Sequence, residues 1–202
     1  ELFSPKGIYE RNDVIVREFE GLPFIKGCVK GECSSQILLK HNDLQFIVDL
    51  ENGQKTGFFL DHQDNWPHIH RVVKDAEVLD AFCYTGTFAI NAAKYGAKKV
   101  IGLDICADAI ALAQRNAQLN NATDICEFYE LNAFDILKNW HKENKFFDTI
   151  ILDPPVLTKS RLNLDKAING YREINLRAMK LLRSGGFLIT TCSSNLITKE
   201  QF

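Results

Sequence analysis

Asp153-Pro154-Pro155 is the most specific group of residues with chemical potential in this sequence. It closes an apolar run, Phe147–Asp153, that predicts a buried strand. Each proline biases the residue before it toward an extended backbone, so Asp153 should be held rigidly where the strand ends. Ligands of open α/β sheets bind at the carboxyl ends of the strands, and we therefore predict that Asp153 faces a ligand. A turn that merely ends a strand is the alternative.

A second group of residues predicts a binding site for a nucleoside. Val78–Phe88 joins a predicted strand to a predicted helix through a tight turn at Gly86. Backbone N–H groups of such a turn can hold a carboxylate or a phosphate. Asp104 ends the next predicted strand, about 20 residues further on, where a carboxylate can bind both hydroxyls of a ribose. Together these features predict a nucleoside-containing cofactor.

The class of cofactor follows from what the turn lacks. Asp80–Gly86 does not contain the three glycines that let a backbone approach a pyrophosphate, which disfavours a dinucleotide. A methionine carboxylate and a sulfonium need no such approach, so the turn favours S-adenosylmethionine. Asn132, just past the third predicted strand, can hydrogen-bond an adenine edge, although capping of the loop explains this residue equally well.

Cys192 is the candidate nucleophile, at the end of the fifth predicted strand and beside the strand that carries Asp153. A thiolate is a strong nucleophile even when only a few per cent of the thiol is ionised. The alternative is an inert strand thiol, since free cysteine is among the most buried residue types. No metal site is predicted, because the cysteines lack metal-ligand spacing. We expect the other cysteines to be reduced: Cys28, Cys33, Cys83, Cys106 and Cys126.

A parallel sheet is needed to bring these side chains together. From Glu77 onward, short apolar runs alternate with helical periodicity, which predicts repeated strand–helix units. The predicted strands are Glu77–Phe82, Lys99–Ile105, Ile125–Leu131, Phe147–Asp153 and Gly186–Cys192. The predicted helices are Thr87–Tyr95, Asp108–Leu119, Phe134–Glu143 and Asp165–Leu182.

The first part of the chain predicts a small antiparallel β unit, because its apolar runs are short, alternating and separated by turn residues. The predicted strands there are Val14–Phe19, Val29–Glu32, Gln36–His41 and Leu44–Leu50. A helical run after this unit contains Pro67, near which we expect a break. We place the domain boundary between residues 1–52 and 53–202.

Composition limits the class of protein. The chain has 202 residues, of which 46% are hydrophobic and 25% charged, as expected of a globular protein with one main domain and a smaller appendage. No stretch approaches the roughly 20 apolar residues of a membrane span, and no leader pattern is present, so we expect a cytoplasmic protein. The formal net charge of −2 gives no global attraction to a polyanion. Binding of nucleic acid would need a local basic patch or a further domain.

Four motifs together resemble the bacterial large-subunit ribosomal RNA cytosine-5 methyltransferase family: Asp80–Gly86, Ile150–Pro155, Gly170–Asn175 and Gly53–Asp61. The resemblance covers nearly the whole chain. It implies a Rossmann-like α/β class I methyltransferase with a mainly parallel sheet, preceded by a small β-rich domain. The family also has an N-terminal PUA RNA-binding domain and terminal antiparallel strands, so we expect this chain to be a fragment that lacks both.

The resemblance implies a role for each candidate residue. The Cys83–Gly86 loop would bind the methionine end of S-adenosylmethionine, Asp104 its ribose and Asn132 its adenine, with Lys55 and Thr56 closing over the cofactor. The predicted catalytic residues are Cys192 and Asp153. The predicted cofactor-binding residues are Lys55, Thr56, Phe82, Cys83, Tyr84, Thr85, Gly86, Asp104, Ile105, Asn132, Ala133 and Asp153.

This chain departs from the family's pattern in three places. His62-Gln63 stands where the family usually has Gln-Arg, which removes a cation that could meet the cofactor carboxylate. Leu157 stands where an aromatic residue could stack on a flipped base. Cys192 comes one residue before the family's nucleophile, whose place Ser193 takes. A shift of one residue in a strand points a side chain to the other face unless a bulge absorbs it.

The activity implied by the resemblance is methylation of C5 of a cytosine in large-subunit ribosomal RNA. Cys192 would add to C6 of the base and Asp153 would stabilise the adduct. RNA would be the partner, no membrane is expected, and a homodimer is left open. One alternative is methylation of a guanine nitrogen without a covalent nucleophile. Another is an RNA-binding protein that has lost catalysis, and a nicotinamide dehydrogenase is disfavoured by the missing glycines.

Overall fold

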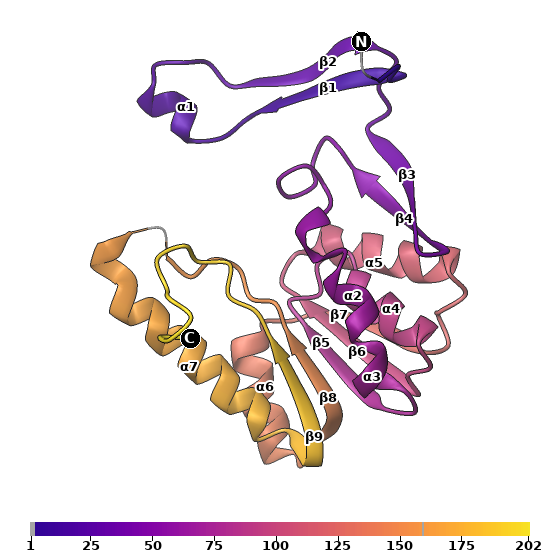
Figure 1. Cartoon of the computed structure of the whole chain (residues 1–202), viewed down its shortest axis with the longest axis vertical. Coiled ribbons are helices and arrows are strands. Elements are labelled where there is room, and N and C mark those ends of the chain that lie inside the picture. Colours follow the sequence, from indigo (N-terminus) through magenta and orange to yellow (C-terminus); the bar gives the residue numbers. More distant parts are fainter. Residues whose placement is uncertain (1–2, 159) are drawn as a thin grey trace. The chain divides into compact units, whose positions relative to one another are not determined.

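The computed structural model describes residues 3–158 and 160–202, and the chain divides into two compact units, Glu1–Gln63 and Asp64–Phe202 (Figure 1). The β-rich segment predicted for residues 1–52 lies within the first unit. Within the described ranges, no helix combines the length and the apolar character that crossing a bilayer requires.

The second unit is built on a five-stranded parallel sheet in the order β7-β6-β5-β8-β9. Its strands are β5 (Glu77–Ala81), β6 (Lys99–Asp104), β7 (Cys126–Glu130), β8 (Phe147–Leu152) and β9 (Leu182–Thr190). Its helices are α2 (Asn65–His68), α3 (His70–Val73), α4 (Thr87–Lys94), α5 (Ala107–Leu119), α6 (Ala133–Lys142), η2 (Arg161–Asn163) and α7 (Leu164–Met179). The predicted Rossmann-like α/β fold with a parallel sheet is confirmed.

Two layers of helices cover this sheet. Helices α3, α4 and α5 contact the strands on one face, whereas α6 and α7 lie together on the other (Figure 1). Alternate residues of a strand point to opposite faces, and in β5 Leu79 and Ala81 belong to the core under α6 and α7. Asp80 points to the α4 face, where Oδ2 accepts a hydrogen bond from the Ala89 N–H at 2.9 Å. Strand alternation thus places one carboxyl group under the start of α4.

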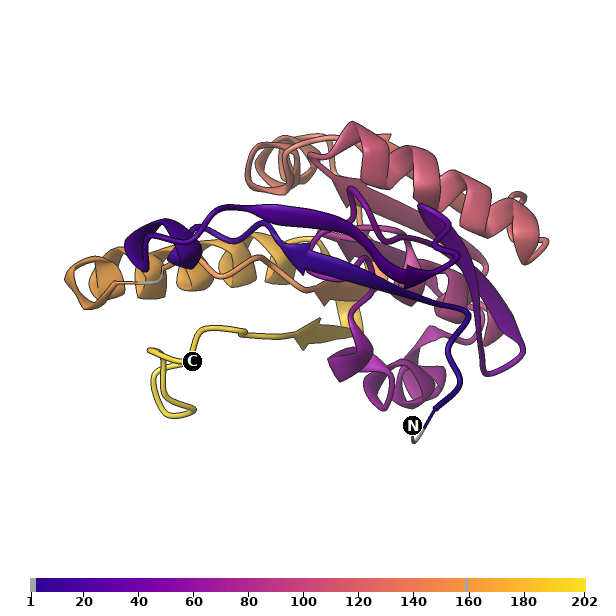
Figure 2. The same ribbon diagram turned by 90° about the horizontal axis from the view of Figure 1, so that it is seen from above.

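The fifth strand differs most from its predicted bounds. β9 begins at Leu182 rather than Gly186, and its pairing with β8 is irregular at the start, because Phe147 lies opposite Leu182 and Thr149 opposite Phe187. The strand ends at Thr190, two residues before Cys192. Figure 2 shows the chain continuing past β9 in the direction of the strand, in the segment that carries Cys192.

The predicted helix break lies slightly later than Pro67. Helix α2 contains this proline in its first turn, where a missing N–H costs nothing, and the break comes at Ile69 between α2 and α3. The ends of the other predicted helices of the second unit differ from the structure by at most three residues.

The first unit contains two antiparallel pairs. They are β1 (Gly7–Asn12) with β2 (Ile25–Gly31), and β3 (Gln36–His41) with β4 (Leu44–Asp49), while α1 (Val16–Phe19) joins the first pair and η1 (Leu60–His62) ends the unit. The strand predicted over Val14–Phe19 is wrong. Gly21 has φ +69° and its N–H donates to the Glu18 carbonyl, while the Leu22 N–H donates to the Arg17 carbonyl. These two bonds form a Schellman motif, which ends a helix rather than a strand.

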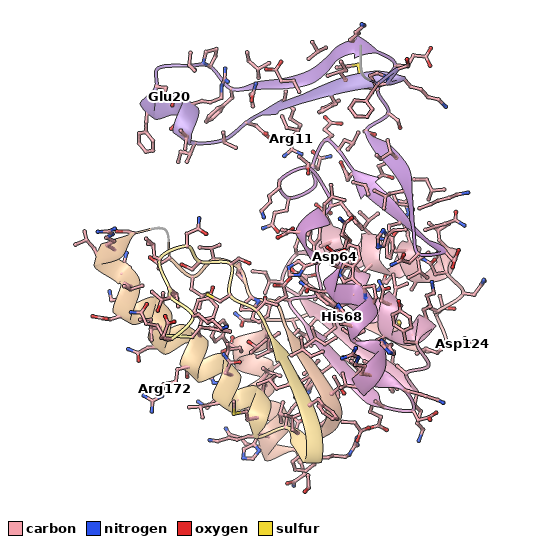
Figure 3. All side chains as sticks on the ribbon, viewed as in Figure 1. Arg11, Glu20, Asp64, His68, Asp124 and Arg172 are labelled. Atoms are coloured by element: carbon pink, nitrogen blue, oxygen red, sulfur yellow. A yellow bond between two sulfur atoms is a disulfide. The ribbon has the colours of Figure 1, made fainter. Side chains whose placement is uncertain are left out.

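The expectation that all cysteines are reduced is also wrong. Cys28 and Cys33 form a disulfide, visible as the yellow bond in Figure 3. Gly31, with φ +73°, turns the chain after β2 and brings the two Cα atoms to 5.7 Å, within disulfide range. The sequence spacing did not reveal this turn. Cys83, Cys106, Cys126 and Cys192 are free.

Candidate active site

The carboxyl ends of the five strands form one edge of the sheet, and the predicted site residues of the second unit follow them. β5 lies between β6 and β8, because the chain moves outward to β7 and then returns to the other side of β5. Loops after β5 and β8 therefore run in opposite directions, which opens a crevice at the switch point of such folds. Backbone bonds extend across this edge: the Asp153 N–H donates to the Ala81 carbonyl and the Thr191 N–H to the Leu152 carbonyl.

The Phe82–Gly86 loop has an unusual backbone. Phe82, Tyr84 and Gly86 all have positive φ, at 67°, 48° and 81°. Non-glycine residues in this region are strained, and such strain persists where the surroundings fix the loop. Asp104 supplies one restraint, since its Oδ2 accepts a hydrogen bond from the Tyr84 N–H at 2.9 Å. The loop is therefore held in shape before any ligand arrives.

Asp104 and Asn132, the residues predicted to bind the ribose and the adenine, already accept hydrogen bonds from backbone N–H groups. Asp104 Oδ1 accepts from the Cys106 N–H at 3.0 Å, so each of its oxygens already receives one bond. A carboxylate oxygen has a second lone pair, which leaves capacity for a ribose hydroxyl. Asn132 caps α6, with Oδ1 accepting from the Phe134 N–H at 2.9 Å. Ile105 is 68% exposed beside Asp104, whereas Ala133 is buried in the core.

Asp80 begins the Asp80–Gly86 motif, but it is absent from the predicted site residues. It is completely buried, and burial together with the nearby charge of Asp153 raises the pKa of its carboxyl to about 8. Within the described part of the chain, Asp80 Oδ1 and Thr85 Oγ1 have no hydrogen-bond partner. Two buried oxygens at the Phe82–Gly86 loop are thus available to a ligand. A carboxylate inside an otherwise apolar strand was the available sequence signal.

Asp153 lies where the sequence predicts, directly after β8, and it has a partner directly after β9. Thr191 Oγ1 donates a hydrogen bond to Asp153 Oδ1. Pro154, which follows, is buried. One carboxylate oxygen is therefore oriented by the segment after β9, and Thr191 had no signal in the sequence that would have indicated this role.

Cys192 is half-buried beyond β9 and lies near Tyr171 of α7. The Tyr171 hydroxyl donates a hydrogen bond to the Pro155 carbonyl at 3.4 Å. Burial, the Cys192 side chain and the charge of Asp153 raise the pKa of Tyr171 to about 12. The thiol, the Asp153 carboxyl and the Tyr171 hydroxyl thus share one neighbourhood.

Several predicted residues lie outside this neighbourhood or have a different environment. Lys55 and Thr56 belong to the first unit, so their contact with a cofactor stays a prediction. Cys83 is buried, and burial raises the pKa of its thiol well above the usual value, which makes it unreactive. Leu157 packs against α7, since a Cβ on Gly170 would come within 2.9 Å of its Cδ1. Ser193 is exposed.

The second unit fits the predicted cofactor in its donor and acceptor chemistry. Asp80 Oδ1 can accept from an ammonium group, which would replace the proton held there. The Thr85 hydroxyl can donate to a carboxylate, and Asp104 can accept from a ribose. Hydrogen bonds already orient both carboxyl groups, since Asp80 accepts from the Ala89 N–H and Asp104 from two backbone N–H groups. Among the described residues, no group of three or more His, Cys, Asp or Glu side chains could hold a metal ion.

Comparisons with known proteins place the chain in context. A family model described as S-adenosylmethionine-dependent methyltransferase matches residues 26–201. Ribosomal RNA large subunit methyltransferase I of Shewanella amazonensis is 40% identical over 204 residues, which cover 100% of this chain and 52% of that protein. The protein of the same name from Alteromonas mediterranea is 38% identical over 196 residues, covering 96% of this chain and 49% of that protein. This chain spans about half the length of the curated relatives that it matches.

Solved structures agree on the fold. A protein named as an S-adenosylmethionine-dependent methyltransferase from Streptococcus mutans superposes with a TM-score of 0.75 at 25% identity, over 88% of this chain and 47% of that one. A tRNA m1G37 methyltransferase from Methanocaldococcus jannaschii gives a TM-score of 0.60 at 21% identity, over 91% of this chain and 46% of that one. The second likeness shows a shared fold.

Proposed function

We propose that this chain methylates C5 of a cytosine in large-subunit ribosomal RNA. The premise is its family, because the chain belongs to the S-adenosylmethionine-dependent methyltransferases. The observation that carries the proposal is the shared neighbourhood of Cys192 and Asp153 at the carboxyl edge of the sheet. The names of the curated relatives support ribosomal RNA as the substrate. The more specific proposal, that the enzyme belongs to the PUA-linked cytosine-5 methyltransferases, rests on the four sequence motifs that resemble this family.

The chemistry explains why a thiol is needed. C5 of an aromatic pyrimidine is a poor nucleophile, and covalent addition at C6 overcomes this. The Cys192 sulfur forms a bond to C6 with its own electron pair, and the C5=C6 electrons move to C5. S-adenosylmethionine, when bound, would supply an electrophilic methyl group, to which C5 would bond with this electron pair as the methyl–sulfonium bond breaks and S-adenosylhomocysteine leaves. Loss of the C5 proton to a base then returns the electron pair, the C6–S bond breaks, and the thiolate is restored.

Asp153 has a separate task in this proposal. Its carboxylate, oriented by Thr191, can accept a hydrogen bond from the N3/N4 edge of the base. N3 gains electron density when the thiolate adds to C6 and takes up a proton, and the carboxylate then accepts a hydrogen bond from this N3–H, so it stabilises the adduct more than the free base. Thr191 is a positioning residue, because it acts on the base only through Asp153.

The residues that would bind S-adenosylmethionine are proposed from the same family resemblance. Asp104, the Phe82–Gly86 loop and Asn132 would hold the ribose, the methionine end and the adenine. Lys55 and Thr56 of the first unit would contribute from outside the sheet. RNA is the proposed partner, and the proposed substrate implies a cytoplasmic location.

The test of this function is a trapping experiment. The chain, within its full-length protein, is incubated with S-adenosylmethionine and large-subunit RNA that contains 5-fluorocytosine. Fluorine at C5 cannot leave as a proton does, so a covalent enzyme stays attached to the RNA. We expect a stable complex with the wild-type protein and none with Cys192→Ala.

The matched control is Cys106→Ala, which removes an exposed free thiol near the ribose end of the edge. This variant should form the complex as the wild type does. Methylation of a guanine nitrogen by the wild type, with no trapped complex, would contradict the proposal. Mass spectrometry of the RNA nucleosides distinguishes 5-methylcytosine from a methylated guanine.

A further inference from the structure

We propose that Leu162, in the short helix η2 before α7, is an apolar wedge that enters a stack of RNA bases and fills the place of the extruded target base, while Arg161 and Lys166 bind phosphates beside it. The inference rests on the proposed function and deepens it, because it concerns how the same site reaches a base in RNA. None of the residues predicted for catalysis or for cofactor binding lies in η2.

Leu162 is the most exposed large apolar side chain of the described residues, at 95%. A lone exposed leucine is ordinary on a protein surface. Leu162 differs because hydrogen bonds fix its backbone. Its N–H donates to the Ser160 side chain at 3.3 Å, and the Asn163 N–H donates to the Ser160 carbonyl at 3.1 Å. The apolar side chain is therefore presented to solvent by an ordered turn.

Buried residues anchor this turn at both of its ends. Thr158 is 7% exposed, and its hydroxyl donates to the Ser160 carbonyl at 2.9 Å and accepts from the Ser160 N–H at 3.1 Å. On the other side η2 continues directly into α7, in which Ala167 and Tyr171 are buried. The chain therefore holds Leu162 in one position before any RNA is bound.

The loop that carries Leu162 begins at the candidate active site. Asp153 follows β8 directly, and Pro155 is tied to α7 by the Tyr171 hydroxyl, which donates to its carbonyl at 3.4 Å. From Leu164 to Tyr171, α7 makes about two turns, or roughly 10 Å at 1.5 Å per residue. Figure 1 shows the start of α7 beyond the ends of β8 and β9. Leu162 can thus lie in a stack while Asp153 meets the base that has left it.

The proposed chemistry requires such an extruded base. The sulfur of Cys192 must approach C6 through a face of the ring, and stacked neighbours cover both faces of a base within a helix. Enzymes that act on bases therefore take the target out of its stack. The gap that remains is unfavourable, and apolar side chains such as leucine occupy gaps of this kind between base steps.

The charges around Leu162 fit a phosphate backbone. Arg161 and Lys166 are exposed, and neither forms a salt bridge with another residue that the structure describes. Asp165 is the acidic residue of segment 160–166, so the segment keeps a positive balance. Since the whole chain has a net charge of −2, RNA needs a local basic patch of this kind. One apolar side chain between cations suits stacked bases between phosphates, whereas a protein partner would need a larger apolar patch.

The first experiment measures binding of the full-length protein to two short RNA duplexes of the same sequence, one of which lacks a single central base. The abasic site offers the gap without the cost of extrusion. By fluorescence anisotropy the wild type should bind the abasic duplex about 5-fold to 20-fold more tightly, because the gap buries the leucine side chain. Leu162→Ala should bind both duplexes equally, and Leu162→Met should keep the preference.

Leu119→Ala is the matched control, because it truncates an exposed leucine at the end of α5, and it should keep the wild-type preference. Lys166→Gln should weaken binding to both duplexes alike and lower the slope of log affinity against log salt by about 1. Each variant should keep the wild-type melting temperature, since these side chains are exposed. Equal affinity of the wild type for both duplexes, or an undiminished preference in Leu162→Ala, would overturn the wedge. An unchanged salt slope would overturn the phosphate contact.

A second measurement separates the wedge from the proposed function. Methyl transfer is compared on folded large-subunit RNA and on short single-stranded fragments of it. Leu162→Ala should lower kcat/KM about 10-fold on the folded RNA and less than about 2-fold on the fragments, which have no stack to open. A wild-type preference for the abasic duplex without any 5-methylcytosine in the RNA contradicts the proposed function alone. Formation of 5-methylcytosine in folded RNA at equal rates by the wild type and Leu162→Ala contradicts the wedge alone.

Discussion

Replacing Asp80 by asparagine tests the protonation of a buried carboxyl at the end of β5. The pKa of Asp80 is raised from 3.8 to about 8, chiefly by burial and then by the charge of Asp153. The folded protein therefore holds this proton over a pH range in which the unfolded chain has lost it. Stability from this group is complete below pH 3.8 and is lost as the pH rises toward 8.

The size of the effect follows from the difference in pKa. One pKa unit corresponds to about 1.36 kcal/mol, so the difference of about four units sets an upper limit on the order of 5 kcal/mol. Relaxation of the loop around an ionised carboxyl reduces this value. Between pH 5 and pH 8 we expect the free energy of unfolding of Asp80→Asn to rise by about 2–4 kcal/mol relative to the wild type. Asparagine keeps an oxygen for the Ala89 N–H and does not titrate.

Urea unfolding at intervals of half a pH unit measures this difference. Asp135→Asn is the control, because Asp135 is exposed in the first turn of α6 and its substitution should give a constant difference over the same range. A difference between Asp80→Asn and the wild type that does not change from pH 5 to pH 8 would refute the reasoning. Asp80 would then be ionised in the folded protein, with a partner for Oδ1.

Three further predictions concern the edge of the sheet. Asp104→Ala should weaken binding of S-adenosylhomocysteine by about 1.5–3 kcal/mol, the worth of hydrogen bonds to a charged group, and unchanged affinity by calorimetry would contradict the ribose assignment. Cys192→Ala should abolish turnover and leave that affinity intact, whereas methylation above a tenth of the wild-type rate would contradict the covalent mechanism. Gly86→Ala should lower the free energy of unfolding by about 1–3 kcal/mol, since φ is +81° and the new Cβ would lie 3.0 Å from the Phe128 ring. Gly185→Ala has the same φ with nothing within 4 Å, so an equal loss in both variants would show that the contact with Phe128 costs nothing.

The sheet was predictable because its signals are local. Strands buried on both faces read as apolar runs, and the helices between them keep their own period. The end of a strand is also visible in sequence, which is why Asp104 and Asp153 were placed correctly at the carboxyl edge. The start of β9 was not predicted correctly, because Arg183 and Gly185 interrupt its apolar run and the pairing with β8 is irregular there.

The residues that orient the site were not predictable in this way. Thr191 meets Asp153, and Tyr171 lies near Cys192, only because β8, β9 and α7 are neighbours in the fold. In the sequence Tyr171 belongs to the Gly170–Asn175 motif but has no assigned role, and Thr191 is one more β-branched residue near a strand. The contacts depend on long-range packing, for which a single sequence carries no local pattern. Asp80 is the exception, since a carboxyl in an apolar strand is costly wherever the strand lies.

The offset of Cys192 from Ser193 also has a different meaning in the structure than in the sequence. The rule that a shift of one residue reverses the face applies within a paired strand. β9 ends at Thr190, and beyond it the Thr191 N–H is the only group of the described residues that still bonds to β8, so strand alternation does not fix the direction of Cys192 or Ser193. Ser193 is exposed, whereas Cys192 is half-buried near Tyr171. A nucleophile needs the neighbours that orient and stabilise it, and this argument favours Cys192 although it lies one residue early.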